Sequence, residues 1–151
     1  MKKIEDSIHQ TAAFRNSYHK ATVNLIASGR WIINLHSELF HHFDLTIQQY
    51  NVLRILKGQH PGTLGIKLIQ RRMLDKASDA SRVVEGLRKK GLVQRNLNGN
   101  DRRKVDVGIT PEGLQLVEKI EQKSDEMDGF LSNLTLEEVG KLNMLLDKIR
   151  S

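Results

Sequence analysis

The 151-residue sequence has no cysteine, only two prolines and few aromatic residues, which make up 5% of the chain. The absence of cysteine excludes disulfide bonds, thiolate zinc sites and cysteine-based redox sensing. No apolar run approaches the roughly 18 residues that span a bilayer, because polar residues interrupt even the richest stretch, residues 23–35. The first six residues contain acids too early for a signal peptide. We therefore expect a soluble, cytoplasmic protein with no membrane partner.

The sequence also lacks the motifs on which most catalytic and cofactor sites depend. It has no glycine-rich phosphate loop, no G-x-S-x-G and no H-E-x-x-H. Six histidines are present, but the adjacent His41 and His42 cannot point the same way from a helix. Glu38 with one of them supplies too few ligands for a zinc site. We expect a protein that is not an enzyme and that binds no cofactor or metal.

What the sequence does have is an excess of basic residues in one segment. Lys and Arg number 24 against 18 Asp and Glu, which gives a formal net charge of +6. Residues 67–104 hold twelve bases and four acids, so this segment carries +8 and the remainder carries −2. A basic segment on a nearly neutral chain is typical of a polyanion-binding surface. Chance clustering on a solvated face is the alternative interpretation.

Apolar residues recur at helical spacing over the first 90 residues. We predict helices over the ranges 6–43, 46–58, 63–74 and 78–90, approximately. Gly29 is a candidate break in the first helix, and Thr46 is a candidate N-cap of the second. The apolar residues expected to face inward in the third helix are Leu64, Leu68, Ile69 and Met73.

The apolar period changes from helical to two after residue 91. Strands are predicted over residues 92–97 and 105–109, and the Asn-Gly turn sequence between them predicts a β-hairpin. Thr110, followed by proline, caps a long helical region. Thr135 and Glu138 have the spacing of a capping box for a last helix. The order of elements is helices, a helix-turn-helix, a hairpin and helices.

The predicted helix over residues 78–90 has the features of a helix that reads DNA. Polar residues occupy its first turns, where they can meet base edges, and its apolar residues can pack on the preceding helix. Phosphates favour the N-terminal end of a helix. The candidate DNA contacts are the groove-facing Ser78, Asp79, Ser81 and Arg82 and the phosphate-binding Arg71, Arg72 and Lys76. A core helix whose polar residues merely face water explains this segment equally well.

The predicted hairpin favours DNA binding. Its tip carries Asp101, Arg102, Arg103 and Lys104. A basic tip can enter a minor groove, where narrow A·T-rich stretches concentrate negative potential around an inserted arginine. Asp101 can pair with Arg103 and hold its guanidinium in one direction, although an exposed turn with a weak surface ion pair is the alternative. A helix-turn-helix followed directly by a basic hairpin is a winged helix.

Two stretches of this region resemble the MarR family of bacterial transcription regulators. Residues 87–95 (LRKKGLVQR) match the family pattern L-x-x-K-G-L-V, and residues 100–113 (NDRRKVDVGITPEG) contain its D-x-R and T-x-x-G elements. Ile109 stands where the family usually has leucine. Gly86, in the middle of the candidate DNA-reading helix, is a departure that costs roughly 1 kcal/mol relative to alanine and indicates close packing there.

The resemblance implies a mainly α-helical fold with a small β-hairpin wing (α+β). In a single domain of residues 1–151, a winged helix-turn-helix lobe of about residues 46–111 would be flanked by dimerisation helices of about 1–45 and 112–151. The apolar stripes of these flanks also exceed what one lobe can cover, so a homodimer is expected in preference to a monomer with folded-back helices. The family resemblance further implies that the dimer binds an inverted repeat in double-stranded DNA, with Arg103 in the minor groove, and represses nearby genes until a small effector relieves repression.

Members of this family often bind aromatic or lipophilic acids between the dimer helices and the lobes. The candidate effector-binding residues are Arg30, Trp31, His36, Phe40, Phe43 and Tyr50. Arg30 or a histidine would meet the carboxylate, and the helical spacing of the aromatic residues also fits an ordinary core. The alternative to a regulator of this kind is a winged-helix module that binds protein or RNA without an effector response.

Overall fold

A computed structural model describes residues 3–97 and 105–151 of the chain. The fold is mostly helical, with a small three-stranded antiparallel sheet in the order β1-β3-β2. The elements in chain order are α1 (Ile4–Ser7), α2 (Ser17–His41), α3 (Ile47–Lys57), β1 (Leu64–Gly65), α4 (Ile66–Arg72), α5 (Ala80–Lys89), β2 (Val93–Leu97), β3 (Val105–Ile109), α6 (Pro111–Glu121), α7 (Ser124–Gly129) and α8 (Leu136–Ile149).

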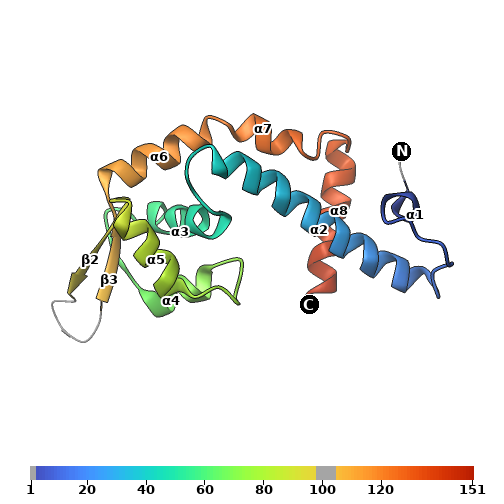
Figure 1. The fold of residues 1–151 in the computed structure, drawn as a ribbon, viewed down its shortest axis with the longest axis horizontal. Coiled ribbons are helices and arrows are strands. Elements are labelled where there is room, and N and C mark those ends of the chain that lie inside the picture. The colour runs from blue at the N-terminus through green and yellow to red at the C-terminus, as the bar shows by residue number, and fades with distance from the viewer. Residues whose placement is uncertain (1–2, 98–104) are drawn as a thin grey trace.

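The sheet and helices α3, α4 and α5 form a lobe at one end of the molecule (Figure 1). Helix α2 extends away from this lobe toward α1, and α6 and α7 lead from the sheet to α8 at the same far end. A winged helix-turn-helix lobe carrying long helical flanks is therefore confirmed as the fold. In the part of the chain that the structure describes, no helix is both long enough and apolar enough to cross a membrane.

Side-chain caps set where several of these helices begin. The Thr46 hydroxyl accepts the Gln49 N–H at 3.1 Å, and the Gln49 side chain accepts the Thr46 N–H at the same distance. Thr135 and Glu138 make the corresponding pair of bonds at the start of α8. Thr110 caps α6 by accepting the Gly113 N–H at 3.1 Å. The three threonine caps predicted from the sequence are confirmed, and each fixes the point at which a loop becomes a helix.

Four sequence predictions are wrong in detail. Helix α2 runs unbroken through Gly29, because a single glycine costs only about 1 kcal/mol and leaves the hydrogen-bond ladder intact. The start of the predicted third helix is instead β1, where Leu64 pairs with Val107 and covers the open side of β3. Leu68, expected to face inward, is 38% exposed. The long helical region after Thr110 is divided into α6 and α7.

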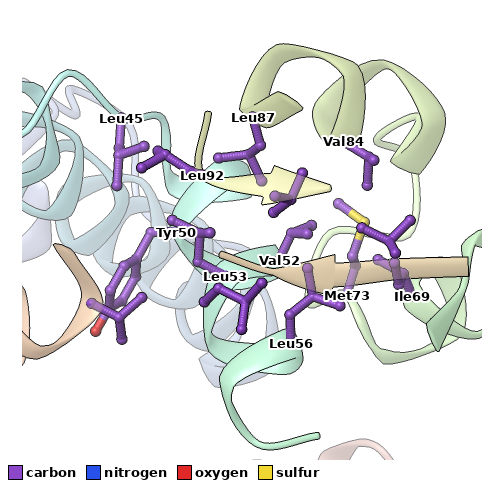
Figure 2. Packing of buried hydrophobic residues seen from close by; sticks show 14 of the residues in the cluster. Leu45, Tyr50, Val52, Leu53, Leu56, Ile69, Met73, Val84, Leu87 and Leu92 are labelled. Atoms are coloured by element: carbon purple, nitrogen blue, oxygen red, sulfur yellow. The ribbon is translucent and has the colours of Figure 1, made fainter. Parts of the chain in front are cut away.

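The buried core lies in the lobe. Its fully buried members come from the end of α2, from α3, α4, α5, the sheet and α6, and from Met73 just after α4. Figure 2 labels ten residues of the cluster. Burial of each such aliphatic side chain stabilises the fold by about 1.5–3 kcal/mol. Phe40 from α2 packs against Tyr50 from α3 with ring centroids 4.3 Å apart, which docks the end of α2 on the lobe. No residue of α1 or α8 is buried.

The turn between α2 and α3 is attached to the C-terminal end of α5. Asp44 has a left-handed backbone with φ of 52°, a conformation that aspartate tolerates better than most residues. The Lys90 ammonium lies 3.0 Å from Asp44 Oδ2 and also donates to the Asp44 carbonyl. One lysine therefore links the end of the long helix α2 to the end of α5.

Apolar side chains outside the lobe are left uncovered. In α8, Leu136, Met144, Leu145 and Ile149 are each more than half exposed, Leu136 at 92%. In α2, Ile26 and Ile33 are more than half exposed. Exposed apolar residues at this density are typical of a surface that meets another protein.

Candidate DNA-binding surface

Helix α5 begins with a cap that orders its first turn. Asp79 Oδ1 accepts the backbone N–H groups of Ser81 at 2.9 Å and Arg82 at 3.3 Å. The Ser81 and Arg82 side chains are exposed, whereas Ser78 is half-buried just before the helix. The structure thus gives Asp79 a capping role and leaves Ser81 and Arg82 on the surface.

The turn that leads into α5 is held by Gln70 of α4. Gln70 Nε2 donates to the carbonyls of Lys76 at 3.2 Å and Ser78 at 2.8 Å, and its Oε1 accepts the Ala80 N–H at 2.9 Å. One side chain therefore joins α4, the turn and the first residue of α5. Sequence reasoning missed Gln70, because a lone glutamine within a predicted helix carries no local signal.

A second group of bonds lies within the same turn. Asp75 accepts the Ser78 hydroxyl at 2.6 Å and the Ala77 N–H at 3.0 Å. These bonds hold the pKa of Asp75 below its usual value, and the bond from the Ser78 hydroxyl has the largest effect. Lys76 donates to the carbonyl of Arg71. The approach to α5 is consequently ordered before any ligand arrives.

Exposed bases surround this turn. Arg71 and Arg72 lie in the last turn of α4, and Arg72 donates to the Gln59 side chain at 3.4 Å. Within residues 3–97 and 105–151, the side chains of Arg71, Arg72, Lys76 and Arg82 form no ion pair with a carboxylate. The four predicted bases are therefore available to bind phosphate.

The predicted hairpin is present as β2 and β3, paired in the register Arg95 with Val107 and Leu97 with Val105. The predicted tip contacts, Asp101, Arg102, Arg103 and Lys104, lie outside the described residues. Arg95 of β2 reaches back to α5, with Nη1 3.3 Å from Glu85 Oε2. Arg88 pairs with the same carboxylate at 2.8 Å. Both arginines lower the pKa of Glu85, and Arg88 has the larger effect.

Gly86 faces the start of α3. A Cβ atom at residue 86 would lie 2.9 Å from Gln49 Nε2, so the Gln49 side chain occupies the space that a larger residue would need. A larger residue at this position would require the end of the Gln49 side chain to move. The two helices enclose a hollow of 640 Å³ that Ser78, Asp79 and Arg82 also line.

A separate pocket of 590 Å³ lies among α2, α3 and α7. Its lining residues are His36, Phe40, Ile47, Tyr50, Asn51, Arg54, Leu74, Ser124, Met127 and Asp128. The structure brings together His36, Phe40 and Tyr50 of the six predicted effector residues and places the other three elsewhere. Because α2 is one continuous helix, Arg30 and Trp31 lie more than a turn nearer its N-terminal end. Trp31 lines a hollow of 280 Å³ beside α1, and Phe43 packs against the core.

The pocket contains an arginine that was not predicted. Arg54 lies one turn after Tyr50 on α3. The Tyr50 side chain is close enough to raise the pKa of Arg54, with Glu121 contributing less, although the two side chains do not meet in hydrogen-bond geometry. The Tyr50 hydroxyl is buried and has no hydrogen-bond partner within the described ranges. In Figure 2 this oxygen points away from the labelled aliphatic residues. The four-residue spacing of Tyr50 and Arg54 was the available sequence signal.

His36 enters the pocket from α2 in a fixed orientation. Its Nδ1 lies 2.9 Å from the Ile32 carbonyl, so this nitrogen carries the hydrogen, because a carbonyl only accepts. Its ring also meets Phe130 edge-on with centroids 5.1 Å apart. Among residues 3–97 and 105–151, no three His, Asp or Glu side chains come together as a metal site.

Comparison with known proteins points to one family. Residues 43–104 match the model of the MarR family. The HTH-type transcriptional repressor IacR of Pseudomonas putida is 29% identical over 122 residues, which are 80% of this chain and 71% of that protein. The multiple antibiotic resistance protein MarR of Salmonella typhimurium is 38% identical over 71 residues, 46% of this chain and 49% of that protein. A crystal structure of a mutant MarR from E. coli complexed with operator DNA has a TM-score of 0.73 at 27% identity, covering 83% of this chain and 91% of that one.

Proposed function

Because the chain belongs to the MarR family of DNA-binding transcription regulators, which are not enzymes, we propose that it is a homodimeric repressor. Each lobe binds one half of an inverted repeat in double-stranded DNA, and a small aromatic or lipophilic acid relieves repression. As a DNA-binding regulator it acts in the cytoplasm. The observation that carries this proposal is the capped start of α5, which presents an unpaired Arg82 between the bases of α4 and the wing strands.

The proposed DNA contacts divide by role. Ser81 and Arg82 face base edges from the first turn of α5, and Arg71, Arg72 and Lys76 bind phosphates beside it. Asp79 and Ser78 act indirectly, because their side chains order the helix start and the turn. The operator DNA bound to the similar MarR of E. coli supports duplex DNA as the partner. Arg103 in the minor groove remains a prediction from the sequence.

The proposed dimer forms through the helical flanks, residues 1–45 and 112–151, and leaves the lobe of residues 46–111 to bind DNA. The exposed apolar residues of α2 and α8 support this division, because a second copy can cover them. Two-fold symmetry would place the two copies of α5 in successive major grooves, about 34 Å apart.

The proposed effector site is the pocket among α2, α3 and α7. Its volume of 590 Å³ lies within the range of small-molecule sites, and its lining combines aromatic side chains with Arg54 and an unpartnered Tyr50 hydroxyl. Arg54 takes the role of carboxylate partner that the sequence assigned to Arg30 or a histidine.

Footprinting on the DNA that flanks the protein's own gene tests the DNA-binding part of the proposal. We expect protection of an inverted repeat, with log Kd rising by about 0.9 per log unit of salt for each phosphate contact. A structured RNA of equal length serves as the control. Equal binding to RNA, or no binding to any duplex in dilute buffer, would favour the alternative module and reject the regulator.

A further inference from the structure

Glu121, at the end of α6, is shared unequally by two cations of α3. Lys57 Nζ donates to Glu121 Oε2 at 2.5 Å. Arg54 Nη1 lies 3.4 Å from Glu121 Oε1 and makes no hydrogen bond to it. The Arg54 side chain is also half-exposed, and exposed ion pairs of this length are weak. Lys57 therefore holds the carboxylate, whereas Arg54 keeps N–H donors free.

Arg54 also faces the pocket, and Lys57 does not line it. Beside Arg54, Tyr50 is 9% exposed and lines the same pocket, and its buried hydroxyl has no hydrogen-bond partner within the described ranges. A buried hydroxyl of this kind lacks a partner that a ligand oxygen can supply. A carboxylate placed here would receive donors from a guanidinium and a phenol.

We infer that Glu121 is a built-in competitor for Arg54: a carboxylate ligand takes Arg54 from Glu121, and Lys57 retains Glu121 when Arg54 turns to the ligand. This inference rests on the effector part of the proposed function. The exchange lowers the cost of binding, because Glu121 is never left without a cation. Asp128 also lines the pocket and repels an anion placed near it, which directs the carboxylate toward Arg54.

Calorimetric titration of the full chain with 2-naphthoate and with its neutral amide, 2-naphthamide, tests the exchange. We expect wild type to bind the acid about tenfold or more tightly than the amide, and Arg54→Gln to abolish this preference. Glu121→Gln removes the competitor and should raise naphthoate affinity about threefold. Lys57→Gln leaves Arg54 as the sole partner of Glu121 and should lower the affinity for naphthoate.

Glu118→Gln is the matched control, because Glu118 is an exposed acid of α6 that changes the net charge equally. If Glu121→Gln gives no more naphthoate affinity than Glu118→Gln, while wild type still prefers the acid, the exchange is wrong and the effector site stands. If wild type binds neither compound, both the exchange and the effector site are rejected. The DNA footprint of the ligand-free protein tests the proposed DNA-binding function separately from the effector site.

Discussion

Arg95 of the wing strand β2 and Glu85 of α5 form an ion pair with 3.3 Å between Nη1 and Oε2. Arg95 Nη2 also donates to the Ser81 carbonyl at 3.4 Å, within the first turn of α5. A single side chain of the wing thus contacts both the start and the middle of the helix proposed to enter the major groove. The wing and this helix are positioned relative to each other in each lobe.

Glu85, paired with Arg88 and to a smaller extent with Arg95, predicts a pH-dependent contribution to stability. The folded pKa of Glu85 lies below its ordinary value of 4.5, so the carboxylate stabilises the fold above pH 4.5 and this contribution is lost as pH falls through the lowered pKa. Glu85→Gln should therefore reduce the free energy of unfolding at pH 7, and the deficit should shrink below pH 4.5. Urea unfolding of wild type and Glu85→Gln from pH 7 to below pH 4.5 measures this deficit, with Glu118→Gln as control. A deficit that is constant with pH would contradict the assignment.

Removal of Gln70 should separate stability from DNA binding. Gln70→Met deletes three hydrogen bonds at the turn before α5, which should lower the free energy of unfolding by about 1–2 kcal/mol. Duplex affinity should fall about tenfold, because the start of α5 loses its support. Fluorescence anisotropy with the footprinted repeat measures the affinity. Gln115→Met, at an exposed position of α6, should change neither quantity, and equal behaviour of the two variants would remove Gln70 from the DNA-binding mechanism.

Arg103→Ala tests the part of the site that was predicted from sequence only. Loss of a minor-groove arginine should weaken duplex binding about tenfold or more and leave the dimer intact. Lys119→Ala removes the same charge from an exposed position of α6 and should have little effect. Anisotropy and sedimentation give the two readouts. Tight operator binding by Arg103→Ala would exclude the wing tip from recognition.

A charge on α8 should disrupt the proposed dimer. Leu145 is 52% exposed in one chain, and Leu145→Glu would bury an unpaired carboxylate in the interface. We expect the dimer Kd to rise about a hundredfold, measured by sedimentation equilibrium. Leu68→Glu places the same charge on an exposed apolar residue of α4 and should leave the dimer unchanged. A monomeric wild type would reject the dimer directly.

Gly113 is required by a close contact at the junction of the wing and α6. A Cβ atom there would lie 2.2 Å from the Leu92 carbonyl oxygen, which also accepts the Thr110 N–H at 3.1 Å. Gly113→Ala should therefore destabilise the fold by about 3 kcal/mol in urea titrations. Gly29→Ala meets no atom within 4 Å and should be neutral or stabilising by up to about 1 kcal/mol. Similar effects of Gly113→Ala and Gly29→Ala on stability would show that the backbone around residue 113 can shift to accommodate a Cβ atom.

The sequence predicted those features whose causes are local. Thr46, Thr110 and Thr135 cap helices through bonds to residues three positions on, and the hairpin strands follow from a period of two. β1 was not predicted, because its partner lies some 40 residues away and two residues carry no period. The lining of the pocket proposed for the effector was predicted in part, because it depends on how α7 meets α3. The predicted helix over residues 46–58 already placed Arg54 one turn after Tyr50, so Arg54 could have been predicted from this spacing.

The attachment of Asp44 to Lys90 has a mechanical consequence. Helix α2 is about 37 Å long, and its inner end is fixed to the far end of α5 by this contact. In the proposed dimer, this contact would couple a tilt of α2 to α5, the helix proposed to enter the major groove. Because α2 is long, a small change of its angle in such a dimer would then become a larger displacement of α5 at its far end.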